Sequence, residues 1–339
     1  MQPREYSKRL GVIAPEQLQA ALDCFGLGRL LGAEPAPGGL FGQNVFLSST
    51  EGEFVLRGAP HYGWVFPNGG QFHKERFYAR LIHERTSVPA PWPYLLDESP
   101  QIFGWEYAIM PRLPGLQVGD AEVRRGLSDG DKEQVARALG LGLADLHALT
   151  WPHLGDYDHE NDSVKPDPRP FPERVRASIE DWYERCRRAS GATTDADIDW
   201  CRSLVAANED ALDVPFQPTI VHHDYKEGNC VLERVADGWR ISGVFDLMEC
   251  YFGDPEEDLP RSVFDYAGRG GGRARDFVTA YARLATLRPG HQERFRIYML
   301  RDCLVMWEYG QRNGVWFDRG QEFQPWAKRF VELDTFASP

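Results

Sequence analysis

The stretch from Thr219 to Leu259 reads TIVHHDYKEGNCVLERVADGWRISGVFDLMECYFGDPEEDL, and the interpretation of the whole chain starts from it. The β-branched run Thr219–Val221 leads directly into polar residues, and a second apolar run, Ile241–Phe245, ends at Asp246. Between these runs, Ala236-Asp237-Gly238 is typical of a turn. The pattern predicts a strand that delivers a polar loop, followed by a hairpin that brings a second carboxylate near the first.

The polar loop has the residue types that phosphoryl transfer needs. His222, Asp224 and Asn229 match the kinase catalytic-loop pattern of His-x-Asp, four residues, then Asn. A substrate hydroxyl needs an oriented carboxylate to accept its proton, and a triphosphate needs oxygen ligands for Mg²⁺. We therefore predict that Asp224 and His222 are catalytic, and that Asn229 and Asp246 bind the metal.

A second motif follows the hairpin and reads Gly253-Asp254-Pro255-Glu256-Glu257-Asp258-Leu259. Together, the two motifs resemble those of the aminoglycoside phosphotransferase and choline kinase family, which are small-molecule kinases with a protein-kinase-like fold. Two departures are visible. Leu247 and Met248 follow Asp246 where protein kinases have Phe and Gly, and His223 stands where relatives usually carry Gly. The bulk and the titratable ring of His223 bear on the geometry of the loop.

Each feature also has a purely structural interpretation. A His-Asp pair is commonly a hydrogen-bonded surface or core pair, and Gly228-Asn229 or Gly253-Asp254-Pro255 can be simple turns. Asp258 before Leu259-Pro260 is a good helix N-cap with proline in the first turn, whatever the function. The joint order of the features favours the catalytic interpretation.

The resemblance implies an α+β, protein-kinase-like bilobal fold. Residues 1–112 would form a small nucleotide-binding lobe with an antiparallel sheet and one main helix, and residues 113–339 a larger, mostly helical lobe for catalysis and substrate binding. Glycine lets backbone amides approach phosphates, and arginine can fork onto phosphate oxygens. The implied cofactor-binding residues are Gly39, Gly42 and Asn44 in a glycine-rich turn, Arg57 in the place of the β3 lysine, Glu75 as its partner, and Met110 and Arg112 at the hinge beside adenine.

Apolar periodicity predicts helices in both halves of the chain. The predicted helices are Glu16–Phe25, Phe72–Arg85, Asp131–Leu149, Glu173–Ala189, Asp195–Leu212, Asp276–Leu287 and Glu293–Tyr309. Lys74 is expected to be solvated and His147 to be structural. Residues 155–167 carry several carboxylates and are expected to form a solvated loop, with an acidic substrate rim as the alternative. Residues 307–309 belong either to a substrate wall or to the core.

The composition excludes several classes of protein. Of the 339 residues, 42% are hydrophobic and 26% charged, as in soluble globular proteins. No apolar run could span a bilayer, and the N-terminus has no signal segment. Six cysteines without a Cys-x-x-Cys pair fit reduced thiols rather than a zinc site. The net charge of −13 argues against nucleic acid and would attract a cationic substrate. We therefore expect a cytoplasmic protein with no membrane partner.

The sequence thus predicts a phosphotransferase that moves the γ-phosphoryl group of ATP, with GTP as an alternative donor, to a hydroxyl of a small molecule in the presence of Mg²⁺. The resemblance implies aminoglycoside-type antibiotics as one acceptor class, and with them antibiotic resistance. Two alternatives remain. One is a nucleotide-binding pseudokinase. The other is a metal-dependent phosphohydrolase with His222, His223 and Asp224 as ligands, although such a doublet normally lies on a helix and the flanks here are β-like.

Overall fold

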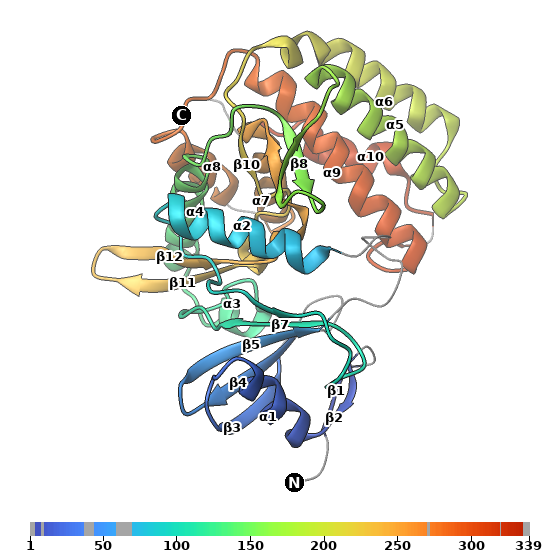
Figure 1. Cartoon of the computed structure of the whole chain (residues 1–339). Coiled ribbons are helices and arrows are strands. Elements are labelled where there is room, and N and C mark those ends of the chain that lie inside the picture. Colours follow the sequence, from blue (N-terminus) through green and yellow to red (C-terminus); the bar gives the residue numbers. More distant parts are fainter. Residues whose placement is uncertain are drawn as a thin grey trace.

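The computed structural model describes residues 4–7, 10–36, 44–58, 70–269, 272–318 and 320–334. These residues form a smaller lobe built on an antiparallel sheet and a larger, mostly helical lobe (Figure 1). The α+β bilobal fold predicted from the sequence is therefore correct. The proposed boundary between residues 112 and 113 stays a prediction, although the last long strand of the sheet ends close to it, at Pro111.

The smaller lobe contains five antiparallel strands in the order β3-β4-β5-β7-β6. The alternating burial along β4 and β5 places one face of the sheet against helix α1, where Leu22, Leu47 and Ile109 share a buried cluster. The elements are β1 (Arg4–Ser7), β2 (Gly11–Ile13), α1 (Pro15–Cys24), β3 (Leu30–Pro35), β4 (Asn44–Ser49), β5 (Gly52–Gly58), β6 (Leu95–Asp97) and β7 (Tyr107–Pro111).

Helix α2 (Gln71–Arg85) lies between the sheet of the smaller lobe and the larger lobe (Figure 1). Its buried residues Phe72, Tyr78 and Ile82 belong to the same apolar cluster as the helices of the larger lobe. The helix begins one residue before the predicted start and ends at the predicted residue. Its packing fixes the position of Glu75, which lies on the same helix and is buried.

The larger lobe consists mainly of helices. Those predicted from an apolar stripe lie within about four residues of their predicted bounds, except that the helix predicted over Asp276–Leu287 ends six residues early, at Tyr281. These are α4 (Asp129–Leu146), α5 (Phe171–Ala189), α6 (Asp195–Asn208), α8 (Arg273–Tyr281) and α9 (His291–Asn313). Three shorter helices complete the lobe, and of these only the start of one was predicted, at Leu259 after the cap position Asp258. These are α3 (Ala121–Arg125), α7 (Leu259–Ala267) and α10 (Phe323–Val331).

The two strands that lead into the functional motifs pair with each other. Strand β10 (Thr219–Val221) is antiparallel to β13 (Tyr251–Gly253), with Ile220 opposite Phe252. Strands β11 (Cys230–Val235) and β12 (Gly238–Val244) form the hairpin that the sequence predicted. This arrangement brings the polar loop after β10, the end of β12 and the second motif to one region of the larger lobe.

The acidic segment 155–167 is not the predicted loop. It forms a hairpin of β8 (Gly155–Asp158) and β9 (Ser163–Pro166), which extends the sheet in the order β10-β13-β8-β9. The prediction that Lys74 is solvated is also wrong. The hairpin faces α2, so that Lys74 is buried and its Nζ lies 2.8 Å from Asp156 Oδ1.

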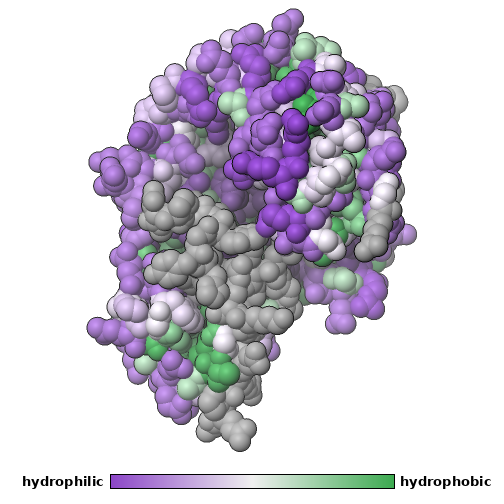
Figure 2. Space-filling view, turned by 90° about the vertical axis from the view of Figure 1, so that its right-hand side faces the viewer, coloured by the Kyte–Doolittle hydropathy of each residue, from purple (hydrophilic) through white to green (hydrophobic). Residues whose placement is uncertain are grey.

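Of residues 307–309, Trp307 belongs to the core rather than to a substrate wall, whereas Glu308 and Tyr309 are half-buried. Trp307 is fully buried and packs against Phe317, Phe323 and Trp326. The face of the larger lobe seen in Figure 2 is mostly hydrophilic. Among the described helices, none is long and apolar enough to cross a membrane.

Candidate active site

Asp258, the last aspartate of the second motif, holds the polar loop after β10. It is fully buried and accepts hydrogen bonds from the backbone N–H groups of His222 (2.7 Å) and His223 (2.6 Å). Its Oδ2 also lies 3.1 Å from Nε2 of His147. Burial would raise the pKa of Asp258, but these contacts outweigh it and keep the pKa below the ordinary value.

The expected role of Asp258 as a helix cap is only half right. It occupies the N-cap position of α7, but its side chain makes no capping hydrogen bond. The Asp258 carboxylate instead contacts the backbone N–H groups of His222 and His223 and the ring of His147. His147 was expected to be structural. It is buried, and its second ring nitrogen lies 2.9 Å from the Tyr281 hydroxyl.

The imidazole of His222 joins the two halves of the site. Its Nε2–H donates to Phe245 O at 3.0 Å, and its Nδ1 accepts from the backbone N–H of Asp224 at 3.3 Å. Both contacts fit a single neutral tautomer. The ring therefore ties the polar loop to the residue before Asp246, and its nitrogens are occupied by backbone groups rather than directed at a metal.

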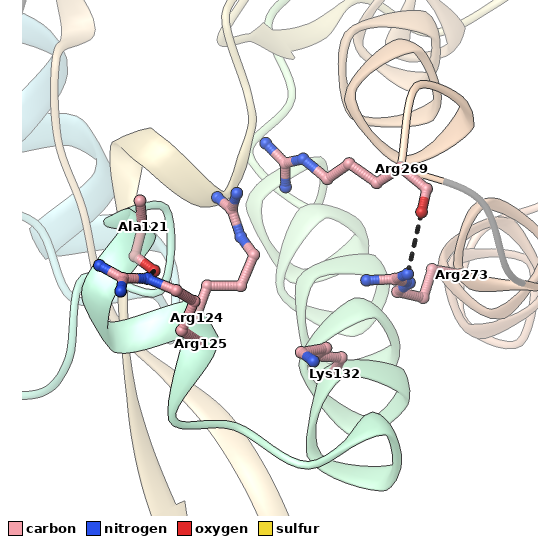
Figure 3. A pocket seen from close by; sticks show the side chains of 6 residues that line it. All are labelled: Ala121, Arg124, Arg125, Lys132, Arg269 and Arg273. Atoms are coloured by element: carbon pink, nitrogen blue, oxygen red, sulfur yellow. Dashed lines mark hydrogen bonds between the residues drawn. The ribbon is translucent and has the colours of Figure 1, made fainter.

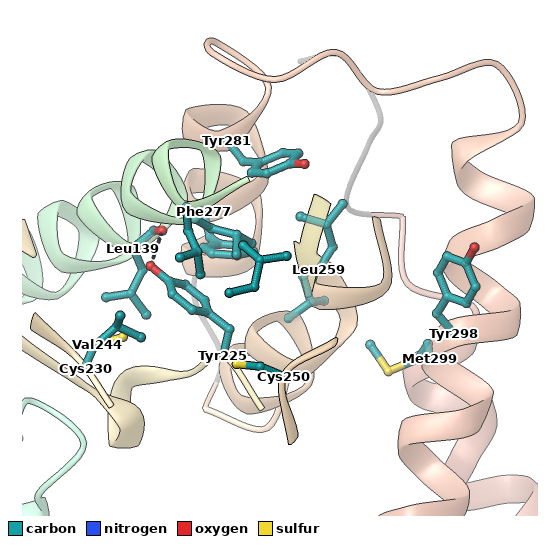
Figure 4. Packing of buried hydrophobic residues seen from close by; sticks show 14 of the residues in the cluster. Leu139, Tyr225, Cys230, Val244, Cys250, Leu259, Phe277, Tyr281, Tyr298 and Met299 are labelled. Carbon is teal, nitrogen blue, oxygen red and sulfur yellow. Dashed lines mark hydrogen bonds between the residues drawn. The ribbon is translucent and has the colours of Figure 1, made fainter. Parts of the chain in front are cut away.

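Tyr225 anchors the loop in the core. The side chain is fully buried, and its hydroxyl donates to Leu139 O on α4 at 2.9 Å. Figure 4 shows the ring among Leu139, Phe277 and Leu259. Asp224 thus lies between a residue held by Asp258 and a residue held by the core, which fixes the direction of its side chain.

The Asp224 carboxylate is surrounded by donors but remains accessible. It accepts from Lys226 Nζ at 2.7 Å, Arg261 Nε at 2.6 Å and Asn229 Nδ2 at 2.8 Å. Burial alone would raise the pKa of Asp224, but Arg261 and Lys226 more than offset that effect and hold it well below the ordinary value. The side chain keeps 30% of its surface exposed, so a substrate can reach an ionised carboxylate.

A second ionic group forms where the lobes meet. Arg57 Nη2 on β5 lies 3.0 Å from Glu75 Oε1 on α2 and 2.9 Å from Asp246 Oδ1 after β12. Glu75 also accepts from Gln71 at 2.7 Å and from the Tyr94 hydroxyl at 3.0 Å. Burial would lower the pKa of Arg57, but the neighbouring carboxylates raise it above its ordinary value, so the guanidinium stays charged.

The remaining nucleotide-site predictions are spread along the sheet, with Asn44 beside Arg57 at one end of β5 and Arg112 beside Glu53 at the other. Asn44 is paired with Arg57 across β4 and β5, and Met110 at the end of β7 is buried. Among the described residues, Asn44 Oδ1 and Arg57 Nε are buried side-chain atoms with no hydrogen-bond partner. The Arg112 guanidinium lies 3.8 Å from the ring centroid of Phe46. Gly39 and Gly42 lie outside the described residues.

The oxygen donors near β12 fit a magnesium ion carried by a nucleotide. Phe245 N–H donates to Asn229 O at 3.1 Å, which places Asn229 beside the residue that precedes Asp246. Mg²⁺ commonly takes one or two protein oxygens and completes its shell with phosphates and water. The described part of the chain has no group of three or more His, Cys, Asp or Glu residues that could hold a metal alone. The amide of Asn229 and the carboxylate of Asp246 could supply these one or two protein oxygens.

Two cations beside Asp224 were missed by the sequence analysis. Lys226 follows Asp224 by two residues, so its place within the first motif was the available signal. Arg261 lies in the first turn of α7, three residues after Asp258, and contacts Asp224 because Asp258 brings that helix to the loop. Both His223 (φ 69°) and Asp246 (φ 64°) have left-handed backbone conformations, which are uncommon for residues other than glycine. The sequence analysis had pointed to the backbone geometry at His223 only.

Comparisons with known proteins agree with this geometry. A search of the curated proteins found no match. Several solved structures share the fold at low sequence identity. An aminoglycoside phosphotransferase, a thermostable mutant in ternary complex with ADP and hygromycin B, has a TM-score of 0.64 and 16% identity, over 94% of this chain and 98% of that one. The macrolide 2′-phosphotransferase of Brachybacterium faecium has a TM-score of 0.59 and 20% identity, over 93% and 98%.

A third structure, the GDP complex of a wild-type aminoglycoside 2′-phosphotransferase, has a TM-score of 0.60 and 14% identity, over 94% of this chain and 98% of that one. Independently of these structures, the family model of the phosphotransferase enzyme family matches residues 32–295, which contain both motifs and the Arg57–Glu75 pair. The chain therefore belongs to the phosphotransferase enzyme family.

Proposed function

We propose that the protein transfers the γ-phosphoryl group of ATP to a hydroxyl of a small molecule, with Asp224 as the base. The observation that carries this proposal is the accessible Asp224 carboxylate, which two cations keep ionised and the anchored loop keeps in place. A general base must be both reachable and deprotonated, and Asp224 is both. The site then works mainly by positioning and charge stabilisation.

In this mechanism Asp224 accepts the hydroxyl proton as the oxygen attacks the γ-phosphorus. Lys226 and Arg261 lie beside the carboxylate and keep it ionised until it accepts the proton, which neutralises its negative charge. His222 serves as a positioning residue, because both of its ring nitrogens bind backbone groups.

On the nucleotide side, Arg57 would contact the phosphates, with Glu75 holding its guanidinium. Asn229 and Asp246 would bind Mg²⁺, which supplies charge neutralisation to the phosphate oxygens when bound. In the structure, Asp246 is paired with Arg57. Asp246 would hold Mg²⁺, and Arg57 would contact phosphate oxygens, once this direct contact has opened. Replacing Asp246 with alanine should therefore abolish Mg²⁺-dependent turnover.

The acceptor is proposed at the level of a chemical class. The chain carries a net charge of −13, which favours an acceptor with amino groups. Among proteins with this fold, the solved complexes include hygromycin B, and one enzyme is a macrolide 2′-phosphotransferase. We therefore propose amine-bearing polyhydroxyl compounds, with aminoglycoside-type antibiotics as the first class to test.

The experiment measures Mg²⁺-dependent ADP release from ATP against aminoglycosides, macrolides, choline, homoserine and sugars. The Asp224→Asn variant is the blank, because it keeps the shape of the side chain and removes the base. We expect one acceptor class to stimulate ADP release in the wild type only. A wild type that binds nucleotide but gives no stimulated release with any acceptor would contradict the proposal and favour a pseudokinase.

A further inference from the structure

A cavity of about 320 Å³ lies on the larger lobe, away from the Arg57 cluster. Its wall is formed by α3, the first turn of α4, Arg269 after the end of α7, and Arg273 at the start of α8. The side chains of Arg124 and Arg125 from α3 enter it from the side opposite Arg269 and Arg273 (Figure 3). The lining residues are Ala121, Arg124, Arg125, Lys132, Arg269 and Arg273. Five cations thus line one cavity in a chain whose net charge is −13.

Two of these cations, Arg125 and Lys132, form only weak ion pairs. Arg125 lies 3.6 Å from Glu122, and Lys132 lies 3.3 Å from Asp129. The two carboxylates are 88% and 93% exposed, so water and salt screen both pairs. These two pairs are therefore weak, and an anion of higher charge can replace the carboxylates.

Arg124 and Arg269 share a single buried carboxylate, that of Glu227. Glu227 lies in the polar loop after β10, between Asp224 and Asn229, and is 5% exposed. Its Oε2 is 3.2 Å from Arg124 Nε and 2.6 Å from Arg269 Nη1. One carboxylate between two guanidinium groups leaves excess positive charge. Arg269 is also within 3.5 Å of Asp265, which in turn pairs with Arg261 beside Asp224.

We propose that this cavity binds a multiply charged oxyanion of the phosphate or pyrophosphate type. Arginine forks match the geometry of phosphate oxygens, and such charge-assisted contacts are among the strongest hydrogen bonds in proteins. An anion here would compete with Glu227 for Arg124 and Arg269. Since Glu227 lies between Asp224 and Asn229, occupancy of the cavity is coupled to the loop that carries the proposed base.

The primary test does not depend on the proposed function. The full chain is titrated with sodium pyrophosphate by calorimetry in the absence of Mg²⁺. The double variant Arg125→Gln/Lys132→Gln removes two cations that do not pair with Glu227 and leaves the Glu227 contacts intact. Arg240→Gln is the matched control, because Arg240 is an exposed arginine that pairs with Glu233 at 2.6 Å on β11.

We expect saturable binding by the wild type and the control, and a dissociation constant at least about tenfold higher in the double variant. Arg57→Gln tests the competing phosphate site and should leave the affinity unchanged. The proposal is overturned if the wild type does not bind, if the double variant binds equally well, or if only Arg57→Gln loses binding. Circular dichroism checks the fold, and Arg273→Gln replaces the double variant if that protein is unfolded.

The anion can be free in solution or part of the acceptor, and a second measurement separates these sources. ADP release is compared for a sugar and for the same sugar carrying a phosphate. If the acceptor supplies the anion, KM for the phosphorylated sugar should be higher in the double variant than in the wild type. A free anion instead makes pyrophosphate change ADP release with the unphosphorylated sugar, in the wild type but not in the double variant. Failure of all ADP release would concern the proposed function, whereas failure of the titration concerns only this cavity.

Discussion

As the proposed base, Asp224 would be ionised near neutral pH, because neighbouring residues maintain the charge of its carboxylate. Burial favours the protonated acid, whereas Arg261 and Lys226 favour the carboxylate, and the cations prevail. The pKa of Asp224 therefore lies below the ordinary aspartate value of about 3.9. Turnover should stay constant as the pH falls, until the pH approaches the lowered pKa of the carboxylate.

Replacing Arg261 with glutamine should move the acid limb of the pH profile to higher pH. The change removes the cation with the larger effect on Asp224, so burial raises the pKa of the carboxylate and protonation begins at higher pH. The measurement is turnover as a function of pH with a fixed acceptor. Asp265→Asn is the control, because it breaks the other pair of Arg261 and leaves Asp224–Arg261 in place. Superimposable acid limbs for the wild type and Arg261→Gln would refute the assignment.

At the level of elements, the position of the site depends on how α4 and α8 pack behind the catalytic loop. Gly140 on α4 faces α8 closely. A Cβ atom at this position would overlap Phe277 O and would lie 3.0 Å from Tyr281 N. Backbone atoms cannot move aside as a flexible side chain can, so the two helices would have to separate.

Gly140→Ala should therefore lower the free energy of unfolding by about 1–3 kcal/mol, the usual cost of overpacking. Gly130 lies on the same helix but is exposed, and the nearest atom to a Cβ there is 3.9 Å away. Gly130→Ala should be neutral or stabilising by up to about 1 kcal/mol, because alanine favours the helix. Urea unfolding of both variants provides the comparison. Equal stability of the two variants would show that α4 and α8 are not in close contact at Gly140.

The elements that the sequence predicted well are those specified by local patterns. The β11–β12 hairpin follows from two apolar runs and a turn, and the long helices follow from their apolar stripes. The pairing of β10 with β13 joins residues about 30 positions apart and has no local signal. Helix α7 is short, and its role depends on the long-range contacts of Asp258. For the same reason, Arg261 could not be placed beside Asp224 from the sequence.

The candidate site shows the same division. The motifs predicted Asp224, Asn229 and Asp246 as site residues, and the resemblance suggested that Arg57 and Glu75 meet, as they do in the structure. The pairing of Lys74 with Asp156 was missed because the acidic segment was expected to be a loop. Charged residues at lobe contacts look like surface residues in the sequence, and only the tertiary packing shows that they are buried.

For the molecule as a whole, the second motif also organises a buried ionic cluster. Asp254, Glu256 and Glu257 are all buried, and they pair with arginines that follow along the chain. Glu256 lies 2.8 Å from Arg294, which is itself fully buried. Glu257 pairs with Arg301. The cluster joins α9 to the segment before α7, which carries Asp258, and therefore supports the catalytic loop.

Arg294→Met should lower the free energy of unfolding by about 3–5 kcal/mol, because it leaves Glu256 buried without its main partner. Denaturant unfolding monitored by circular dichroism gives this value. Arg202→Met is the control, because Arg202 and Glu180 are about half exposed and such pairs contribute about 1 kcal/mol or less. A loss below about 1 kcal/mol for Arg294→Met would mean that the buried cluster does not stabilise the larger lobe.

The proposed reaction moves a phosphoryl group from the nucleotide to a hydroxyl held at Asp224. Phosphorus NMR of the reaction mixture tests it most directly, with ATP, Mg²⁺ and the acceptor that stimulates ADP release. We predict a new phosphomonoester signal that grows as ATP is consumed in the wild type and is absent with Asp224→Asn. Release of inorganic phosphate alone, or formation of the ester at the same rate by Asp224→Asn, would contradict the account.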